Sequence, residues 1–309
     1  MASKKEYVCT LDEKTLDKAK RELNEDPTTR QVHLDKLREM FNSRPDIKFR
    51  SDDAFLLRFL RCKKFSAERA FKTLVRYYET RRDFTDIYGN FVPSRVEYIL
   101  KKNMHYLSVG RDSDGRRVFL FRPGSLEANK AELLDGITTS VMVMEKVIEE
   151  DETQVNGVVV IGDLNGMTMG HATCLGPTIA KKLTDLMQNA LPVRLKAFHY
   201  VNQPAIFDAI FAIFKPFLGE KMKKRLHFHG EEVGDLHKYV PSQLLPAEYG
   251  GAIPEFSNKE LTESLMASEQ DFIENSKYGF PKSKDALGGA SVGEDPAAGL
   301  KGSFKKLEI

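Results

Sequence analysis

The stretch GVVVIGDL, from Gly157 to Leu164, decides the fold class of this chain. Its four consecutive β-branched residues are typical of a strand that is covered on both faces. Helix-length segments are expected on either side of it, at about 131–150 and 178–189, and further strands at LKAFHYVN (195–202) and RLHFHG (225–230). Helices and strands that alternate along the chain in this way predict an α/β fold.

The sheet is expected to begin with a pair of strands joined by a turn. YLSVG (106–110) and RVFLFR (117–122) flank the sequence DSDG at 112–115, whose residues favour a turn. A glycine pair at 250–251 marks the other end of the alternating region. The sequence therefore predicts one α/β domain over residues 104–256.

Residues 1–103 predict a helical module. The sequence TLDE (10–13) has the pattern of a capping box at the start of an amphipathic helix, and SRVE (94–97) repeats that pattern. Ser66 is placed to cap a further helix that runs to about Arg82.

The C-terminal part is expected to contain one helix followed by a tail. A helix is predicted over 257–276. From 277 to 309 the sequence is rich in Gly, Ser, Lys and Asp without periodicity, which is typical of a flexible segment.

Composition narrows the class of protein. The 309 residues are 41% hydrophobic, which is enough for a substantial core. With 47 basic and 45 acidic residues the formal charge is +2, so the total gives no support for a nucleic-acid partner. Three widely spaced cysteines favour a reduced, cytoplasmic setting. Ala2 stands where myristoylation requires glycine, and no segment reaches membrane-spanning length, so any membrane contact is expected to be peripheral and reversible.

The search for catalytic chemistry yields weak candidates. Neither a glycine-rich nucleotide loop nor a serine-hydrolase motif occurs, and no cofactor is expected. His199, His227 and His229 could share one face of a sheet, but without a nearby acid they favour packing over a metal site. Asp163, at a strand end, and Glu145, in an apolar helix, are interpreted as a capping group and a buried ion-pair partner. We therefore expect a protein that is not an enzyme and binds no metal.

The segment Pro204–Phe214 (PAIFDAIFAIF) is almost wholly apolar and runs into the cations Lys215, Lys221, Lys223, Lys224 and Arg225. Eleven residues cannot span a bilayer, since a crossing helix needs roughly 20. Two interpretations remain open at this point. The segment is either a core helix that ends in a solvated basic turn, or a lid that closes a cavity and exchanges protein for lipid.

Five blocks of sequence together resemble the CRAL-TRIO lipid-binding family, and the resemblance extends from about residue 10 to residue 256. The blocks are DDAFLLRFLRCKKF (52–65), ETQVNG (152–157), HYVNQP (199–204), FAIFKPFLGEK (211–221) and LLPAEYGG (244–251). The resemblance implies a helical N-terminal module, then an α/β domain whose mixed sheet floors a hydrophobic cavity. A mobile gate helix closes that cavity in the family, and residues 204–214 fall on it, which favours the lid interpretation.

The resemblance also implies a set of ligand-binding residues. Nearly all are apolar, as a tocopherol-, sterol- or retinoid-sized pocket requires, and Ser140 is the expected polar anchor. The implied residues are Ile137, Ser140, Val141, Met144, Val158, Leu183, Leu186, Met187, Leu191, Val193, Leu195 and Phe198, closed by Ile206, Phe207, Ile210 and Phe211.

Three departures from family patterns bear on the cargo. Tocopherol-transfer members have a second serine where this chain has Met144. Retinaldehyde-binding members use a glutamate in place of Gly162 and a tyrosine in place of Ser140, which makes retinal a less favoured cargo. Phosphatidylinositol-transfer members carry an acidic residue where this chain has Val193, which argues against capture of a headgroup inside the cavity.

The family's phosphoinositide contacts correspond to Lys63, Arg194, Lys221 and Arg225, and all four are cationic here. The resemblance thus implies a monomeric carrier that transfers a small hydrophobic lipid at phosphoinositide-containing membranes, such as those of endosomes. An alternative is a phosphoinositide-binding adaptor in endosomal membrane trafficking. An isomerase that acts on a bound lipid is a third, weaker hypothesis.

Overall fold

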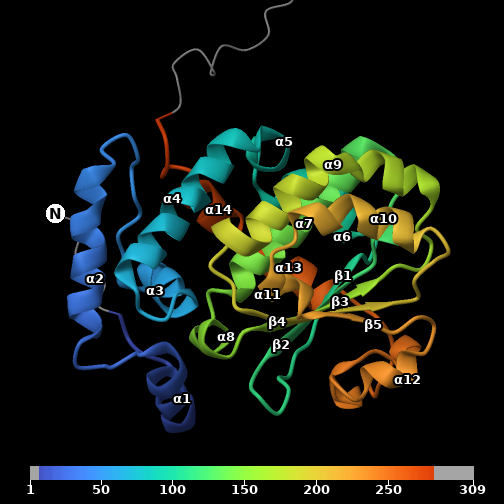
Figure 1. Cartoon of the computed structure of the whole chain (residues 1–309), viewed down its shortest axis with the longest axis horizontal. Coiled ribbons are helices and arrows are strands. Elements are labelled where there is room, and N and C mark those ends of the chain that lie inside the picture. Colours follow the sequence, from blue (N-terminus) through green and yellow to red (C-terminus); the bar gives the residue numbers. More distant parts are fainter. Residues whose placement is uncertain (1–6, 282–309) are drawn as a thin grey trace, which may run out of the picture.

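A computed structural model describes residues 7–281 and shows a helical module packed beside an α/β domain (Figure 1). The domain contains one five-stranded sheet in the order β1-β2-β3-β4-β5. The first pair of strands is antiparallel and the other three pairs are parallel, so the predicted mixed sheet and α/β class are confirmed. Its strands are β1 (His105–Leu107), β2 (Arg117–Phe121), β3 (Val158–Asp163), β4 (Leu195–Val201) and β5 (Leu226–Phe228).

Both faces of the sheet are covered, as the β-branched run predicts. Every residue of β3 is buried. Its residues Val159 and Ile161 face a lower layer that contains α12 (Val233–Leu236) and two 3-10 turns, η6 (Ser242–Leu244) and η7 (Ala247–Tyr249). The upper face lies beneath α7 (Lys130–Val147), α9 (Met169–Asp185) and α10 (Phe207–Phe214) (Figure 1).

Helix α9 starts earlier than expected and is kinked. Gly176 has φ of 42° and interrupts the helical backbone, and Pro177 follows without an N–H to donate. The helix then continues into a π-helical turn, η4 (Leu186–Ala190). The expected helix at about 178–189 is therefore the second half of a longer, bent element.

The N-terminal module consists of α1 (Glu13–Leu23), α2 (Arg30–Glu39), η1 (Met40–Ser43), α3 (Asp53–Cys62), α4 (Ala67–Asp83), α5 (Thr85–Tyr88), η2 (Pro93–Val96) and α6 (Glu97–Leu100). Ser66 caps α4, as predicted. Both predicted capping boxes are wrong. Asp12, rather than Thr10, caps α1, and Ser94 bonds with both its N–H and its hydroxyl to Glu269. In each case a distant or neighbouring carboxylate offers a stronger hydrogen-bond partner than the local pattern suggests.

The C-terminal region holds two short helices rather than one, α13 (Lys259–Ala267) and α14 (Glu269–Asn275), which meet at Ser268. The segment expected to be a tail from residue 277 begins in contact with the helical module. Gly279 exchanges two backbone hydrogen bonds with Lys48, and Tyr278 and Phe280 pack against the module's core. Residues 282–309 of that expected tail lie outside the described residues.

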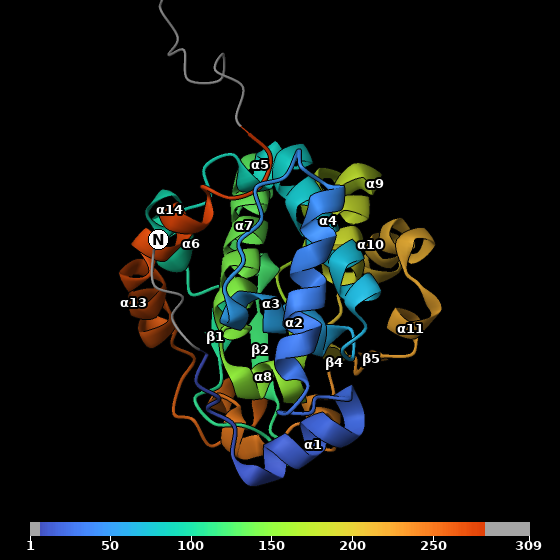
Figure 2. The same cartoon turned by 90° about the vertical axis from the view of Figure 1, so that its left-hand side faces the viewer.

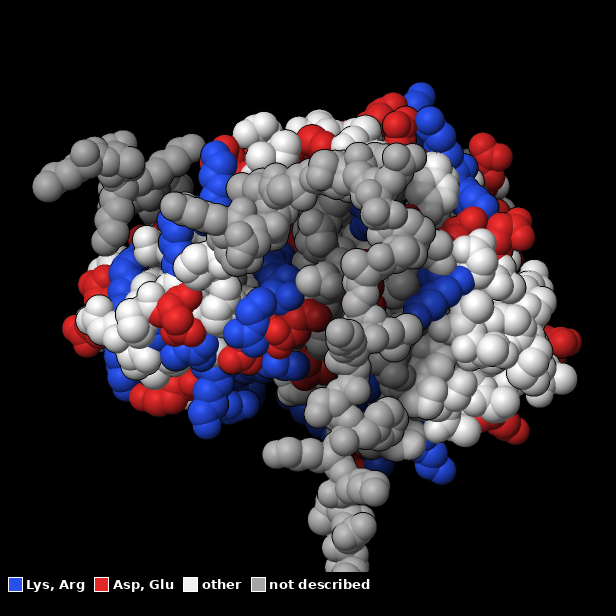
Figure 3. Space-filling view, turned by 90° about the horizontal axis from the view of Figure 1, so that it is seen from above, with Lys and Arg blue, Asp and Glu red and all other residues white. Residues whose placement is uncertain are grey.

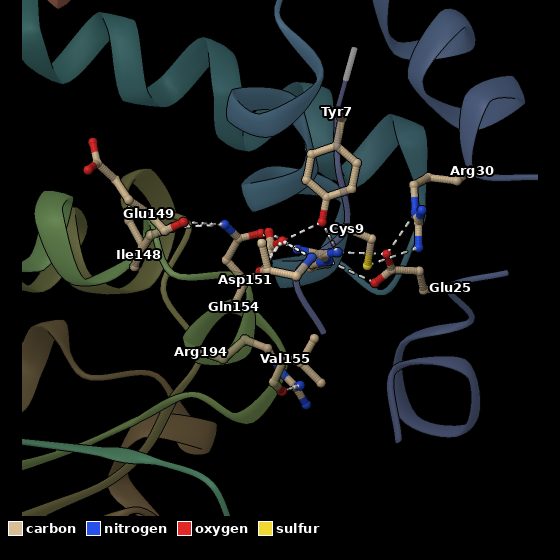
Figure 4. A network of polar contacts seen from close by, with 12 residues as sticks. Tyr7, Cys9, Glu25, Arg30, Ile148, Glu149, Asp151, Gln154, Val155 and Arg194 are labelled. Carbon is tan, nitrogen blue, oxygen red and sulfur yellow. Dashed lines mark hydrogen bonds and ion pairs between the residues drawn. The ribbon is translucent and has the colours of Figure 1, made fainter. Parts of the chain in front are cut away.

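A network of polar contacts that includes Tyr7, Glu25 and Asp151 joins the two parts of the molecule (Figure 4). The arginine that binds both carboxylates, Arg61, is fully buried. Arg61, on α3, binds Glu25 through Nε at 2.8 Å and Asp151 through a terminal nitrogen at 2.6 Å. Asp151 begins α8 (Asp151–Asn156), which also contacts α1 (Figure 2). Tyr7 donates a hydrogen bond to Asp151 at 2.5 Å. Tyr7 and Thr10, which precede α1, are thereby bonded to the α/β domain.

The electrostatics of this network favour the ionised carboxylate. Burial works against ionisation of Asp151, but the positive charge of Arg61 and hydrogen bonds from Tyr7, Arg61 and Thr10 outweigh it. The pKa of Asp151 is consequently held below its ordinary value.

Candidate functional site

An internal cavity of about 240 Å³ lies between the upper face of the sheet and helices α7, α9 and α10. Its lining is almost wholly apolar and includes methionines from several elements. The volume falls just below the roughly 300–1,000 Å³ of typical small-molecule pockets. Methionine side chains are flexible, so the lining can adapt to a larger guest. The methionines are Met104, Met144, Met167, Met187 and Met222.

Most of the ligand-binding residues implied by the resemblance border this cavity. They come from α7, from α9 with its π-turn, from β4 and from α10, and they converge although they are spread over 75 positions of sequence. That they contact a ligand remains a prediction. The residues on the lining are Ile137, Ser140, Val141, Met144, Leu183, Leu186, Met187, Leu191, Val193, Leu195, Phe198, Phe207, Ile210 and Phe211.

Two implied residues do not border the cavity. Val158, at the start of β3, is completely buried in a core cluster with Val147 and Val160, and of the three only Val160 reaches the cavity. Ile206 precedes α10 and packs against the cluster that anchors the beginning of that helix. Both side chains pack against residues that line the cavity without bordering it themselves.

Several lining residues were not anticipated. Phe119 and Phe121 alternate along β2, and Tyr200 lies two positions after Phe198 on β4. Because alternate residues of a strand point to one face, extending the pattern from Phe198 would have identified Tyr200. The further unanticipated residues are Met104, Pro123, Leu126, Leu133, Val160, Leu164, Met167, Leu175, Thr184, Gln188, Phe214, Leu218, Met222 and Leu226.

Helix α10 closes the cavity with a thin apolar layer. Within α10 only Ile210 is buried, and the cavity-lining Phe207, Phe211 and Phe214 are half-buried. The rings of Phe207 and Phe211 each lie 5.3 Å from that of Phe228 on the edge strand β5. The closure therefore rests on aromatic contacts at the border of the sheet.

The end of the lid is held by one glutamine. Gln188, in the π-turn, donates to the carbonyl of Phe217 at 3.0 Å and accepts from the N–H of Gly219 at 2.9 Å. Phe217 ends η5 (Lys215–Phe217), the 3-10 turn that follows α10. The side-chain amide thus connects the lid segment to the wall of the cavity.

Ser140, the expected polar anchor, borders the cavity but already has two partners. Its hydroxyl lies 3.0 Å from the carbonyl of Gly136 and 2.8 Å from Nε2 of His105. A carbonyl can only accept, so both contacts are satisfied when Ser140 donates to Gly136 and accepts from His105. Burial lowers the pKa of His105 to about 3, which keeps the imidazole neutral. Ser140 thus retains one lone pair to offer a guest.

The four implied phosphoinositide residues lie close enough to influence one another. Burial lowers the pKa of Lys221, and the charges of Arg225 and Lys63 lower it further, outweighing an opposing contribution from Cys62. Burial and the charge of Arg194 together lower the pKa of Arg225. These shifts indicate a concentration of positive charge, which favours an anionic ligand.

This group, which we call the basic cluster (Lys63, Arg194, Lys221 and Arg225), has little internal neutralisation. Arg194 pairs with Glu22 at 3.1 Å. Within residues 7–281 the other three cations form no ion pair. Arg194 and Arg225 are held by the backbone carbonyls of Val155 and Leu195, which fixes their positions.

The other chemical candidates are engaged structurally. Asp163 accepts hydrogen bonds from Tyr249 at 2.6 Å, Asn202 at 2.9 Å and the backbone of Asn165 at 3.0 Å. This confirms its interpretation as a capping group. Glu145 is buried and pairs with Arg81 at 2.8 Å, as expected.

The three histidines of the sheet stack on one another. The ring of His199 lies 4.7 Å from that of His227 and 5.2 Å from that of His229. In the part of the chain that the structure describes, no group of three His, Cys, Asp or Glu side chains is arranged to hold a metal ion.

The surface around the lid carries few charges. The uncharged area on the right of Figure 3 lies on the side occupied by α9 and α10 in Figure 1. Met169, at the start of α9, is 56% exposed, and Phe228 beside the lid is 45% exposed. Among the helices of residues 7–281, none is long and apolar enough to cross a bilayer.

The fold and the apolar cavity define a class of protein, one whose interior has room for a hydrophobic guest. Comparison with known proteins agrees with this class. Residues 101–251 match the CRAL/TRIO domain, and residues 26–97 match a Pinta-like UBA domain. The crystal structure of Sfh5 matches with a TM-score of 0.52 over 86% of this chain and 100% of that chain, at 16% identity, which supports the fold alone.

Sequence relatives cover most of the chain. Alpha-tocopherol transfer protein-like from Homo sapiens is 38% identical over 283 residues, which are 91% of this chain and 83% of the relative. Clavesin-2 from Homo sapiens is 34% identical over 271 residues, 87% of this chain and 82% of the relative. The chain therefore belongs to the CRAL-TRIO family of lipid-binding proteins.

Proposed function

We propose that this protein is a carrier that encloses a small hydrophobic lipid and transfers it at phosphoinositide-containing membranes. The observation that carries the proposal is the apolar cavity closed by the single helix α10. The name of the 38% identical relative, alpha-tocopherol transfer protein-like, is consistent with it. The proposed cargo is tocopherol-like, sterol-like or retinoid-like, and the protein is proposed to act as a cytoplasmic monomer without turning the cargo over.

The basic cluster supports the membrane part of the proposal. Arginine binds a phosphate through two parallel N–H groups, and lysine adds a point charge. Lys63, Lys221 and Arg225 are free of acidic partners among residues 7–281 and are therefore available to a headgroup. The cluster would bind the protein to the leaflet, and Lys221 and Arg225 follow the lid helix α10 closely in sequence.

The magnitudes favour a closed state in water. Exposing Phe207 and Phe211 would cost on the order of 1.5–3 kcal/mol each. Basic residues near an anionic leaflet contribute roughly 1 kcal/mol each, so the basic cluster alone barely offsets the two rings. Insertion of lid side chains into lipid supplies the rest, and the cargo leaves when the lid is open.

The identity of the bound molecule tests this function. Native mass spectrometry of the purified full-length protein, followed by lipid extraction, should reveal one lipid per chain, chemically unchanged after incubation. An empty cavity combined with tight binding to phosphoinositide vesicles would instead support an adaptor in endosomal trafficking. The 34% identity to Clavesin-2 keeps that second function under consideration. Conversion of the lipid into a product would support an isomerase.

Loss of the glutamine that holds the lid should accelerate release. Gln188→Ala removes the hydrogen bonds to Phe217 and Gly219, and each such bond contributes about 1 kcal/mol, so release to vesicles should become up to about 30-fold faster. Stopped-flow transfer of a fluorescent lipid measures the rate. Asn189→Ala is the matched control, because Asn189 is exposed and, among residues 7–281, its side chain bonds only to Asp185. Equal release rates in Gln188→Ala and Asn189→Ala would show that this contact does not restrain the lid.

A further inference from the structure

Tyr200 is a polar side chain on the lining of the cavity. Within residues 7–281 its phenolic oxygen forms no hydrogen bond. The residue is half-buried and borders the cavity. Burial alone raises the pKa of the phenol, which keeps the hydroxyl protonated and able to donate. Since no described protein group uses it, this hydroxyl is available to donate to and to accept from a guest.

The other polar side chains of the lining are already engaged. Thr184 donates to the carbonyls of its own helix, at 2.9 Å to Ala180. The amide of Gln188 is used by the lid segment. Ser140 donates its only hydroxyl hydrogen to the carbonyl of Gly136, so it can offer a guest only a lone pair. Tyr200 is therefore the lining residue of the described chain that is able both to donate and to accept.

The ring of Tyr200 is held in place, so its hydroxyl is pre-positioned. It stacks on Phe198 with ring centroids 4.6 Å apart and on Phe228 at 5.7 Å. Below it lies Gly162, where an added Cβ would come within 3.1 Å of both Tyr200 and Phe121. A glutamate at position 162, as in retinaldehyde-binding members, would have to displace these rings.

The position of Tyr200 gives the cargo a direction. Its ring lies 5.9 Å from Phe207 of the lid, whereas Ser140 contacts His105 on β1, at the far edge of the sheet. Strands β1 and β4 are three places apart, or about 14 Å at the usual strand spacing. A guest oxygen bound by Tyr200 would face the lid, and its hydrocarbon part would extend towards α7.

The lining also limits the charge of the cargo. None of the lining residues is Lys, Arg, Asp or Glu, and an ion buried without a partner is strongly disfavoured. Resting on the proposed carrier function, we infer that Tyr200 is the residue that selects the cargo, an uncharged lipid bearing a hydroxyl or carbonyl oxygen, and binds that oxygen at the lid end of the cavity.

The test uses Tyr200→Phe, which removes one oxygen and leaves the ring stack, with Tyr239→Phe as the matched control, because Tyr239 is 46% exposed and lies outside the cavity lining. Full-length protein is incubated with phosphatidylcholine vesicles that contain equal amounts of cholesterol, α-tocopherol, retinol, retinal and the hydrocarbons cholestane and squalene. The protein is separated by gel filtration, and its bound lipids are quantified by mass spectrometry. Thermal unfolding confirms that each variant is folded.

Wild type should enrich at least one oxygenated lipid over the hydrocarbons, and Tyr200→Phe should reduce that enrichment about 3- to 10-fold, the effect of one hydrogen bond. Tyr239→Phe should leave it nearly unchanged. Equal enrichment in wild type and Tyr200→Phe, or an equal loss in Tyr200→Phe and Tyr239→Phe, would overturn the role of Tyr200 while leaving the carrier function intact. Failure of wild type to retain any lipid would overturn the carrier function and this inference with it.

Discussion

Replacing Arg61 with methionine should lower the free energy of unfolding by about 3–5 kcal/mol, because it leaves the buried Asp151 without its cation and removes one of the two arginines that pair with Glu25. Glu25 is 1% exposed and Asp151 is 8% exposed, and both contact the guanidinium at 2.8 Å or less. Methionine fills much of the same space, so the loss reports on charge more than on volume. Chemical denaturation at pH 7 measures it.

Two further measurements separate the unpaired charges from lost packing. Adding Glu25→Gln and Asp151→Asn to the Arg61→Met variant should restore part of the stability, since amides are less costly to bury than carboxylates. If the triple variant is no more stable than Arg61→Met, packing rather than charge is the cause.

The same network predicts the pH dependence of stability. The pKa of Asp151 is lowered in the folded protein, so its contribution is present above the ordinary aspartate pKa and is lost as pH falls through the folded pKa. The difference in stability between wild type and Arg61→Met should therefore be largest near neutral pH and shrink below about pH 4. A difference that stayed constant down to pH 3 would contradict this assignment.

Replacing Lys221 and Arg225 together with alanine should reduce binding and transfer to phosphoinositide vesicles about 30-fold. Each cation near an anionic surface contributes about 1 kcal/mol, and 1.4 kcal/mol is a factor of ten. The affinity for the lipid cargo should remain nearly unchanged, because neither residue lines the cavity. Vesicle flotation and fluorescent lipid transfer, at fixed ionic strength, measure the two quantities separately.

Lys223→Ala with Lys224→Ala is the matched control for this experiment. It removes the same charge from the same region, α11 (Glu220–Lys223) and the residue after it, but Lys223 already pairs with Glu220 at 2.8 Å. The control should lose several-fold less binding. Equal losses in the two double variants would indicate general attraction to the surface rather than a phosphate site.

The sequence predicted those helices and strands that are determined by residues close together in the chain. The β-branched run of β3 indicated a doubly covered strand, and Ser66 indicated the start of α4. The prediction failed where a distant carboxylate was the better partner. The hydroxyl of Thr10 donates to Asp151, 141 positions away, and Ser94 donates to Glu269, 175 positions away. Neither contact can be recognised from the residues next to Thr10 or Ser94 in the sequence.

In the candidate site, too, some features could be predicted from the sequence and others could not. Apolar lining residues could be carried over from family blocks, and Tyr200 could have been found by alternation from Phe198. The restraint on the lid by Gln188 could not, because it depends on the π-turn that aligns this amide with Phe217 and Gly219. The engagement of Ser140 by His105 likewise required the packing of α7 over β1.

Residues 207–225 carry the lid, then η5, then α11 with Lys221, and then Arg225 two residues after α11 ends. Only Leu218 and Gly219 lie between η5 and α11. No flexible linker therefore separates the residues proposed to bind phosphate from the lid that covers the cavity. If Lys221 binds the leaflet, the C-terminal end of α10 is held in place and acts as a hinge. The end of the lid that moves is then the one that begins at Phe207. Cargo would leave on the side of β4, beside the exposed ring of Phe228.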